Sequence, residues 1–300
     1  MKVFWGLERL PEALAGRRAF LLAPPRWDDP VPVVGRWSEL PTGARIDPGE
    51  AEVLLALGGG STIDTAKRVS AETGLPLVSL PTTYSGAEWT TFFGVRDLER
   101  RMRGGGSGSH NEAIVYDVAL VRDLPHDVVG GTALNALAHC CEALYALTRD
   151  PRADPLALEG AELISAALPA WDSNRLLQGA AKAGEALARS GLALGHAMPQ
   201  VIGGAYGLPH GALNAICLPP ALRFNDEFVP PALLGGRAAD RAEELKELAG
   251  FSTLAALGIP GGDLPALAET IAQRPGARAN PRPVTPADVL ELLSAVAGLG

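Results

Sequence analysis

The chain has 300 residues, of which 47% are hydrophobic, and a formal net charge of −8 from 26 basic and 34 acidic side chains. This length favours two domains over one, and the apolar content excludes an intrinsically disordered chain. The acidic balance, without a basic stripe along the sequence, argues against nucleic acid as the main partner.

The first half of the chain alternates between predicted strands and helices, a pattern typical of a parallel α/β sheet. Only WDDP and its neighbours separate the first two predicted strands, too few residues for the crossover helix that a parallel pair normally needs. Residues 96–110 are charged and then glycine-rich, which indicates an exposed hairpin or loop. Hydrophobic runs predict strands at 18–23, 31–34, 51–57, 75–80 and 113–116, with a helix at 63–73.

The most informative stretch in this half reads VLLALGGGSTIDTAK, residues 53–67. A buried strand ends in Gly58, Gly59 and Gly60, where the backbone can turn sharply and a ligand can approach it closely. Ser61 and Thr62 are suited to cap the helix that follows. Because the first N–H groups of a helix attract anions, the motif predicts a phosphate-binding turn. A glycine-rich connection that binds no ligand is the alternative.

From about residue 127 onward, apolar residues recur at helical spacing with few β-branched residues among them, so the second half is predicted to be all-helical. Helix breaks are expected at 150–151, 203–204, 219–220 and 230–231. Thr285 is predicted to cap a last helix that has Pro286 at its first position. The predicted domains are therefore an α/β domain over residues 1–125 and a helical domain over residues 126–300.

Polar side chains that can carry chemistry concentrate in the helical half. Asn135 and His139 are four residues apart and project from the same face of a helix. His196 and His210 flank a glycine-rich turn, so the second can fold back toward the first. Three imidazoles with one amide oxygen are a ligand set for Fe²⁺ or Zn²⁺. Alternatively, each histidine is a packed and hydrogen-bonded residue of the core.

Four ordered segments carry a family resemblance: GGGSTIDTAK, PTTYSGAEWT, GTALNALAHCCEALYA and GHAMPQVIGGAYGLPHGALNAICLPPALRFN. Together they resemble the iron-containing alcohol dehydrogenase superfamily, and within it most closely the maleylacetate reductases. The resemblance implies a dehydroquinate synthase-like architecture, with an α/β nucleotide-binding domain and an all-α catalytic domain, and a homodimer. It also implies NAD(H) or NADP(H) as cofactor, bound by Gly58, Gly59, Gly60, Ser61, Asp64, Lys67, Thr82, Thr83 and Ser85. Finally, it places Asn135, His139, His196 and His210 at the metal-ligand positions, and makes the three histidines catalytic.

The sequence departs from this family at three places. Asn135 stands where metal-dependent relatives have aspartate, which weakens the attraction for Fe²⁺ or Zn²⁺; maleylacetate reductases share the asparagine. Gln200 replaces a second histidine of many relatives. Arg36 follows the second predicted strand, where relatives specific for NAD often have an acidic residue, and an arginine there would tolerate the 2′-phosphate of NADP.

The resemblance favours an oxidoreductase that reduces maleylacetate to 3-oxoadipate by hydride transfer. The histidines would then donate hydrogen bonds and a proton. Tyr84 is either a substrate contact or wall packing; Arg101 and Arg103 either bind the substrate carboxylates or form a solvated charge run. A metal-dependent alcohol or polyol dehydrogenase is a second reading. A non-catalytic nucleotide-binding paralogue with a shortened N-terminal domain is a third.

The compartment follows from weaker signals. The first residues, MKVFWGLERL, lack the hydrophobic region of a secretion signal, and no apolar run reaches membrane-spanning length. The chain has 3 cysteines, and Cys140 and Cys141 are adjacent, so a disulfide framework is not expected. We expect a cytoplasmic protein that acts on a small molecule and binds neither nucleic acid nor a membrane.

Overall fold

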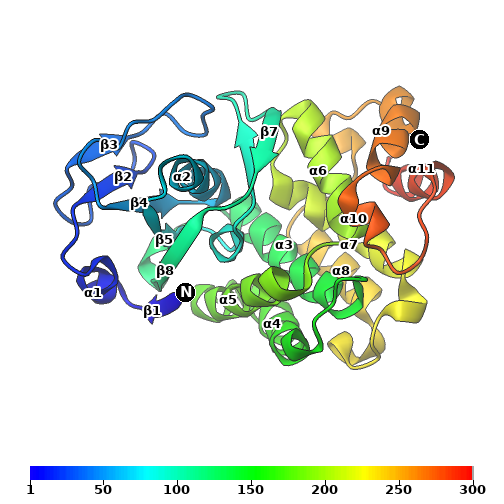
Figure 1. Cartoon of the computed structure of the whole chain (residues 1–300). Coiled ribbons are helices and arrows are strands. Elements are labelled where there is room, and N and C mark those ends of the chain that lie inside the picture. The colour runs from blue at the N-terminus through cyan, green and yellow to red at the C-terminus, as the bar shows by residue number, and fades with distance from the viewer. Residues whose placement is uncertain (299–300) are drawn as a thin grey trace. The chain divides into compact units, whose positions relative to one another are not determined.

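The computed structural model describes residues 1–298. The chain divides into two compact units, Met1–Leu124 and Pro125–Gly300. The first contains a parallel sheet with helices, and every regular element described in the second is a helix (Figure 1). The predicted combination of an α/β unit with an all-α unit is therefore confirmed.

The first unit is built on one six-stranded sheet in the order β1-β8-β5-β4-β2-β3, in which every neighbouring pair is parallel. Its strands are β1 (Lys2–Trp5), β2 (Ala19–Leu22), β3 (Gly35–Trp37), β4 (Val53–Gly58), β5 (Pro76–Pro81) and β8 (His110–Tyr116). β6 (Phe93–Arg96) and β7 (Met102–Gly106) pair antiparallel, so the hairpin expected at 96–110 is present but begins earlier, at Phe93.

Alternating side chains of the central strands build a core on each face of this sheet. Leu55 of β4 packs with the short helix α1 (Leu10–Leu14), whereas its neighbour Leu54 packs with α2 (Gly60–Thr73). This division follows from the two-residue period of a strand, which sends successive side chains to opposite faces. Both faces of β4 are therefore buried, and the turn at its end has a rigid support.

Two details of the sheet differ from the predictions. The second strand lies at Gly35–Trp37, not at 31–34, where Pro32 lacks the N–H group that a ladder needs. The strand β1, at the edge of the sheet, was not predicted. Between β2 and β3 the described segment 23–34 contains no helix, so the absence of a crossover helix is confirmed.

The second unit contains nine α-helices within its described residues: α3 (His126–Tyr145), α4 (Asp154–Ala167), α5 (Ser173–Ser190), α6 (Leu194–Tyr206), α7 (His210–Phe224), α8 (Ala238–Leu248), α9 (Leu264–Ala272), α10 (Pro275–Arg278) and α11 (Pro286–Ala295). Their apolar faces form a core in which α6, α7, α9 and α11 meet. α3 packs against α4, α5 and α7.

The predicted helix ends in this unit are partly wrong. The breaks at 150–151 and 230–231 lie between helices, as expected, and Thr285 caps α11 through a capping box with Asp288. However, α6 continues through 203–204, and α7 continues through Pro219 and Pro220. Both prolines are buried, and the packing of their helix outweighs the backbone hydrogen bonds that proline removes.

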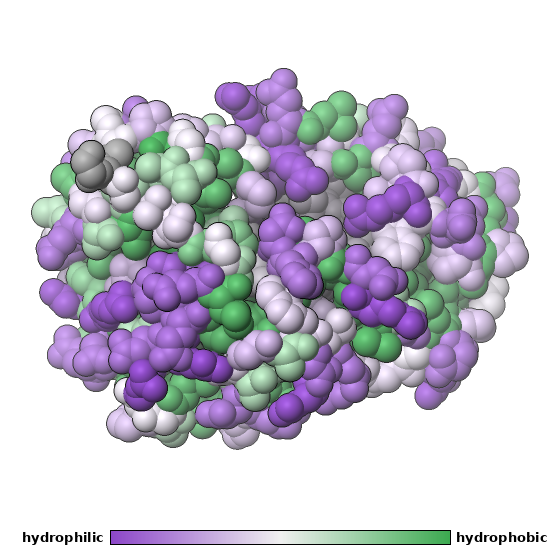
Figure 2. Space-filling model, turned by 180° about the vertical axis from the view of Figure 1, so that it is seen from behind, coloured by the Kyte–Doolittle hydropathy of each residue, from purple (hydrophilic) through white to green (hydrophobic). Residues whose placement is uncertain are grey.

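The surface is mixed in character. Figure 2 shows hydrophilic residues spread over one face, with hydrophobic residues in smaller groups between them. None of the helices described for residues 1–298 combines the length and the apolar character needed to cross a membrane.

Candidate active site

The glycine turn lies at the carboxyl end of β4, which pairs with β2 on one side and β5 on the other. Ligands of parallel sheets bind at this end of the strands, where the strand order reverses. Helix α2 begins at Gly60 with Gly59 as its N-cap, so the prediction that Ser61 or Thr62 caps it is wrong. No side chain accepts a hydrogen bond at this cap, which leaves the first N–H groups of α2 to a ligand.

The segment that follows β5 closes over the turn. A Cβ atom added at Gly59 would lie 3.0 Å from Thr83 Cγ2, and one added at Gly60 would lie 3.2 Å from Ser85 Oγ. Glycine is therefore required by the close approach of this segment. The hydroxyl oxygens of Thr82 and Thr83 are buried and have no hydrogen-bond partner among residues 1–298. These groups fit the diphosphate of a dinucleotide, which offers acceptors for both hydroxyls and for the amides of α2.

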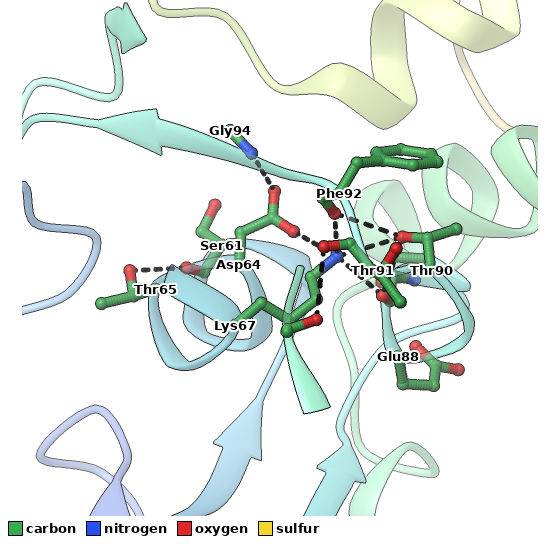
Figure 3. Close-up of polar contacts among 12 residues, drawn as sticks. Ser61, Asp64, Thr65, Lys67, Glu88, Thr90, Thr91, Phe92 and Gly94 are labelled. Carbon is green, nitrogen blue, oxygen red and sulfur yellow. Dashed lines mark hydrogen bonds and ion pairs between the residues drawn. The ribbon is translucent and has the colours of Figure 1, made fainter. Parts of the chain in front are cut away.

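Asp64 and Lys67 lie further along α2, and their polar contacts connect this helix to the segment that follows β5 (Figure 3). The Lys67 ammonium donates to the carbonyl oxygens of Ala87 and Phe92 at 2.9 and 2.6 Å, and to Thr90 Oγ1 at 3.1 Å. It also pairs with Asp64 Oδ1 at 2.8 Å. Since an ammonium has three hydrogens, these four acceptors already satisfy it. A contact of Lys67 or Asp64 with the cofactor remains a prediction from the family resemblance.

Glu88, which lies next to this cluster, was missed in the sequence. Glu88 is 2% exposed, and its carboxyl group accepts a hydrogen bond from the Tyr116 hydroxyl at 2.7 Å. Burial raises the pKa of Glu88, while the hydrogen bond from Tyr116 and the charge of Lys67 act in the opposite direction. A carboxyl group within PTTYSGAEWT, a segment that is otherwise neutral, was the available signal.

The arginines proposed from the sequence have other partners. Arg36 donates through Nη1 to Asp29 at 2.5 Å and through Nη2 to the carbonyl oxygens of Pro24 and Trp27, and so ties down the connection between β2 and β3. Arg103 pairs with Asp97, and Arg101 pairs with Glu99, within the exposed hairpin. The ion pairs of the hairpin agree with the solvated charge run that the sequence left open. Tyr84 is buried, and its contact with the substrate remains a prediction.

In the second unit, the three predicted histidines come together from three helices. His139 of α3 stacks on His196 of α6 with ring centroids 4.6 Å apart and planes at 14°. His196 in turn faces His210, the first residue of α7, with centroids 5.8 Å apart. Asn135 lies one turn before His139 on α3, and its Oδ1 is 3.3 Å from His196 Nε2. The structure therefore brings together the four residues that the sequence singled out, and their role stays a prediction.

Two further polar residues, both missed, hold the group in place. Glu142 Oε2 lies 2.6 Å from His196 Nδ1, and its Oε1 accepts a hydrogen bond from the backbone N–H of His196 at 3.0 Å. Asn214 Nδ2 donates to Asn135 Oδ1 at 2.9 Å and to the carbonyl oxygen of His210 at 3.0 Å. Both residues are fully buried, and both lie one turn after a histidine of the group. A buried carboxyl or amide at i+3 or i+4 from a predicted site residue was the signal that could have found them.

The charge state of one ring is set by its surroundings. Burial lowers the pKa of His139 well below its usual value, and the neighbouring His196 and His210 lower it further. His139 is therefore neutral around pH 7, and its Nδ1 is buried without a hydrogen-bond partner in the described chain. Such a ring serves as a neutral donor or acceptor, not as a cation.

The ligand geometry does not suit the metal ion that the family implies. Asn135 Oδ1 accepts from Asn214 and faces His196 Nε2, so both of its lone pairs are directed at protein atoms. The rings of His139 and His196 are nearly parallel, and lone pairs that lie in their planes do not converge on one point. Within residues 1–298, no three His, Cys, Asp or Glu side chains could hold an ion together. The four residues, as arranged, do not fit a divalent metal.

Comparison with known proteins identifies the family of the chain. Residues 42–121 match the model of the iron-containing alcohol dehydrogenases, and residues 130–297 match the model of the C-terminal region of the Fe-containing alcohol dehydrogenase family. The chain belongs to the iron-containing alcohol dehydrogenase family. It is thus an NAD(P)H-dependent oxidoreductase that acts on a small molecule.

Members of this family that resemble the chain include maleylacetate reductases. Maleylacetate reductase 1 of Rhodococcus opacus is 33% identical over 266 residues, which cover 83% of this chain and 74% of the relative. The enzyme of Burkholderia cepacia is 34% identical over 264 residues, 82% of this chain and 74% of the relative. Among solved structures, the maleylacetate reductase of Rhizobium sp. strain MTP-10005 superposes with a TM-score of 0.85 at 28% identity, over 99% of this chain and 95% of that one. A putative alcohol dehydrogenase from Ralstonia eutropha JMP134 gives 0.88 at 29% identity, with the same coverage.

We predict that Lys67→Met lowers the free energy of unfolding of the protein by about 2–4 kcal/mol, because it removes a buried ammonium from Asp64 and from the carbonyl oxygens of Ala87 and Phe92. The measurement is urea unfolding. Lys182→Met is the matched control, since Lys182 pairs with Glu159 at the surface and its loss should cost less than about 1 kcal/mol. Equal stability of the two variants, together with lost NAD(P)H binding in Lys67→Met alone, would show that the lysine serves the cofactor instead.

We also predict that Asn135→Asp strengthens binding of Fe²⁺ or Zn²⁺ by about tenfold or more, because it adds the anionic oxygen ligand that the site lacks. Metal binding is measured by titration calorimetry and by metal analysis after dialysis. Asn174→Asp, which makes the same charge change at an exposed position, should leave the affinity unchanged. One tightly held ion per wild-type chain that survives chelation would contradict the conclusion drawn from the ligand geometry.

Proposed function

We propose that this enzyme reduces the carbon–carbon double bond of maleylacetate with NAD(P)H and forms 3-oxoadipate. The observation that carries the proposal is Asn135, whose oxygen is engaged by Asn214 and His196 where a metal site would need a free, anionic ligand. A substrate that is electrophilic by itself suits such a site better than an alcohol, whose alkoxide needs a strong positive charge beside it. The resemblance to maleylacetate reductases at 33% and 34% identity supports the same conclusion.

The chemistry of the substrate defines what the protein must supply. Maleylacetate is a 4-oxo-2-enedioate, and its ketone withdraws electrons from the alkene. Hydride adds to C2, the C2–C3 π electrons move toward the ketone oxygen, and the resulting enolate takes a proton at C3. One hydride, one proton and one alkene are consumed, and 3-oxoadipate and NAD(P)⁺ are formed. The protein must therefore hold the cofactor, stabilise an enolate oxygen and provide a proton.

Each unit has groups suited to one part of this task. In the first, the N-terminus of α2 and the hydroxyls of Thr82 and Thr83 would hold the diphosphate of the cofactor, whose dihydronicotinamide supplies the hydride when bound. In the second, His196 and His210 would donate hydrogen bonds to the enolate oxygen and provide the proton. His139 is neutral and stacks on the ring of His196.

A second candidate is a metal-dependent alcohol or polyol dehydrogenase. An iron-containing alcohol dehydrogenase from Corynebacterium glutamicum superposes with a TM-score of 0.87 at 27% identity, over 99% of this chain and 94% of that one. This alternative requires the imidazole group to rearrange around an ion. The third reading, a paralogue without turnover, has no support in the comparisons, because family models of the iron-containing alcohol dehydrogenases match residues of both units.

We predict that the purified protein oxidises NADH or NADPH in the presence of maleylacetate, and that treatment with a chelator leaves the rate unchanged. His196→Gln should lower kcat by about a hundredfold or more, because it removes the group that provides the proton. His126→Gln is the control, since His126 is exposed and stacks on Trp171 away from the imidazole group. Absence of turnover with maleylacetate, with metal-dependent oxidation of alcohols instead, would establish the second candidate.

We further propose that the enzyme is a cytoplasmic homodimer. The three cysteines are free and buried, which suits a reducing compartment. Light scattering of the purified protein should give twice the chain mass of 31.2 kDa, and a mass equal to one chain would contradict the dimer.

A further inference from the structure

The Glu142 carboxylate links two helices at the centre of the imidazole group. It comes from α3, yet one oxygen accepts the backbone N–H of His196 in the first turn of α6, and the other contacts the ring of the same residue. No residue of α6 caps its own N-terminus. A Cβ atom added at Gly195 would lie 2.7 Å from Glu142 Oε1, so the neighbouring glycine admits the carboxylate. Negative charge at a helix N-terminus is favourable, which helps to explain a carboxylate that is completely buried.

On the Nε2 side of the His196 ring, a chain of hydrogen bonds indicates whether Nε2 carries a hydrogen. The carbonyl group of His210 can only accept, so the amide nitrogen of Asn214 must face it. The same nitrogen donates to Asn135, which must therefore present its oxygen. That oxygen lies 3.3 Å from Nε2 of His196. With no cation between them, two acceptors would repel each other at this distance, which favours a hydrogen on Nε2.

We propose that Glu142 and Asn214 are positioning residues, which from opposite sides hold His196 with a hydrogen on Nε2. Glu142 engages Nδ1, fixes the plane of the ring and accepts or shares the hydrogen there. Asn214 fixes the amide of Asn135 and so excludes the arrangement in which Nε2 is bare. Neither residue was predicted from the sequence, and neither needs to touch the substrate.

The geometry gives this hydrogen a use. At 3.3 Å, the bond from Nε2 to Asn135 is long and weak, so the N–H group can turn to a better acceptor. A developing enolate oxygen is such an acceptor. This part of the inference rests on the proposed function, whereas the position of the hydrogen does not.

The alternative is that Glu142 only caps α6 and that Asn214 only packs. Glutamine at position 142 distinguishes the two roles. Its amide oxygen can accept the backbone N–H of His196 while its nitrogen donates to Nδ1, and this arrangement keeps the hydrogen on Nε2. Leucine at position 142 removes the contact with Nδ1 of His196, and leucine at position 214 removes the hydrogen bond that orients Asn135 beside Nε2.

The test is ¹⁵N NMR of protein labelled at histidine, at a single pH near 7. The chain has only 5 histidines, and His196→Gln identifies the signals of His196. We expect Nε2 of His196 to carry hydrogen in the wild-type protein and in Glu142→Gln. In Asn214→Leu we expect a mixture in which bare Nε2 is present. A bare Nε2 in the wild-type protein would overturn the proposal, even if the leucine variants fail to fold.

Kinetics give the second readout. Asn214→Leu should lower kcat for maleylacetate reduction by about tenfold, with KM changed less than about twofold, since the lost constraint acts on the reacting state. Asn174→Leu, at an exposed position, should leave both unchanged. Wild-type kcat in Asn214→Leu would also overturn the proposal. Because the NMR measurement needs no substrate, a hydrogen on Nε2 without any turnover of maleylacetate would refute the proposed function alone.

Discussion

The arrangement of the helical unit depends on one buried carboxylate. Removing a carboxylate from water is costly unless hydrogen bonds and positive charge replace the lost hydration. For Glu142 the hydrogen bonds come from a single residue, because both the backbone N–H and the ring of His196 face it, and the positive end of the α6 dipole adds to them. Packing α3 against α6 at this point therefore places the imidazole, and His139 and His210 are placed around it.

The first unit solves a similar problem with the opposite charge. Lys67 is 1% exposed, and its ammonium is satisfied by Asp64 and by oxygens of the segment that contains Ala87 and Phe92. This segment also carries the residues that close over the glycine turn. A buried charge thus fixes the loop geometry on which the anion-binding amides depend, and the motif G-G-G-S-T-I-D-T-A-K combines a ligand site with its own support.

Much of this could be predicted from the sequence, for reasons that are local. The strand before Gly58 and the three histidines were recognised because hydrophobic period and residue type reveal them directly. The edge strand β1 was missed, since four residues at the start of a chain show no clear alternation. Pro219 and Pro220 suggested a break because their backbone preference is local, whereas the core that keeps α7 intact is not. Glu142 was missed for the same reason: its partner is 54 residues away.

The residue at position 135 and Glu142 together determine the net charge around the three histidines. A site with a divalent cation, an aspartate at position 135 and Glu142 would be neutral in sum. Replacing the aspartate by Asn135 and omitting the cation leaves the buried Glu142 carboxylate to rely on its hydrogen bonds and on the N-terminus of α6. The 2.6 Å separation of Glu142 Oε2 and His196 Nδ1 is that of a charge-assisted hydrogen bond, and this bond offsets part of the cost of burial. The asparagine, held in orientation by Asn214, thus removes one of the two negative charges that a divalent ion would neutralise.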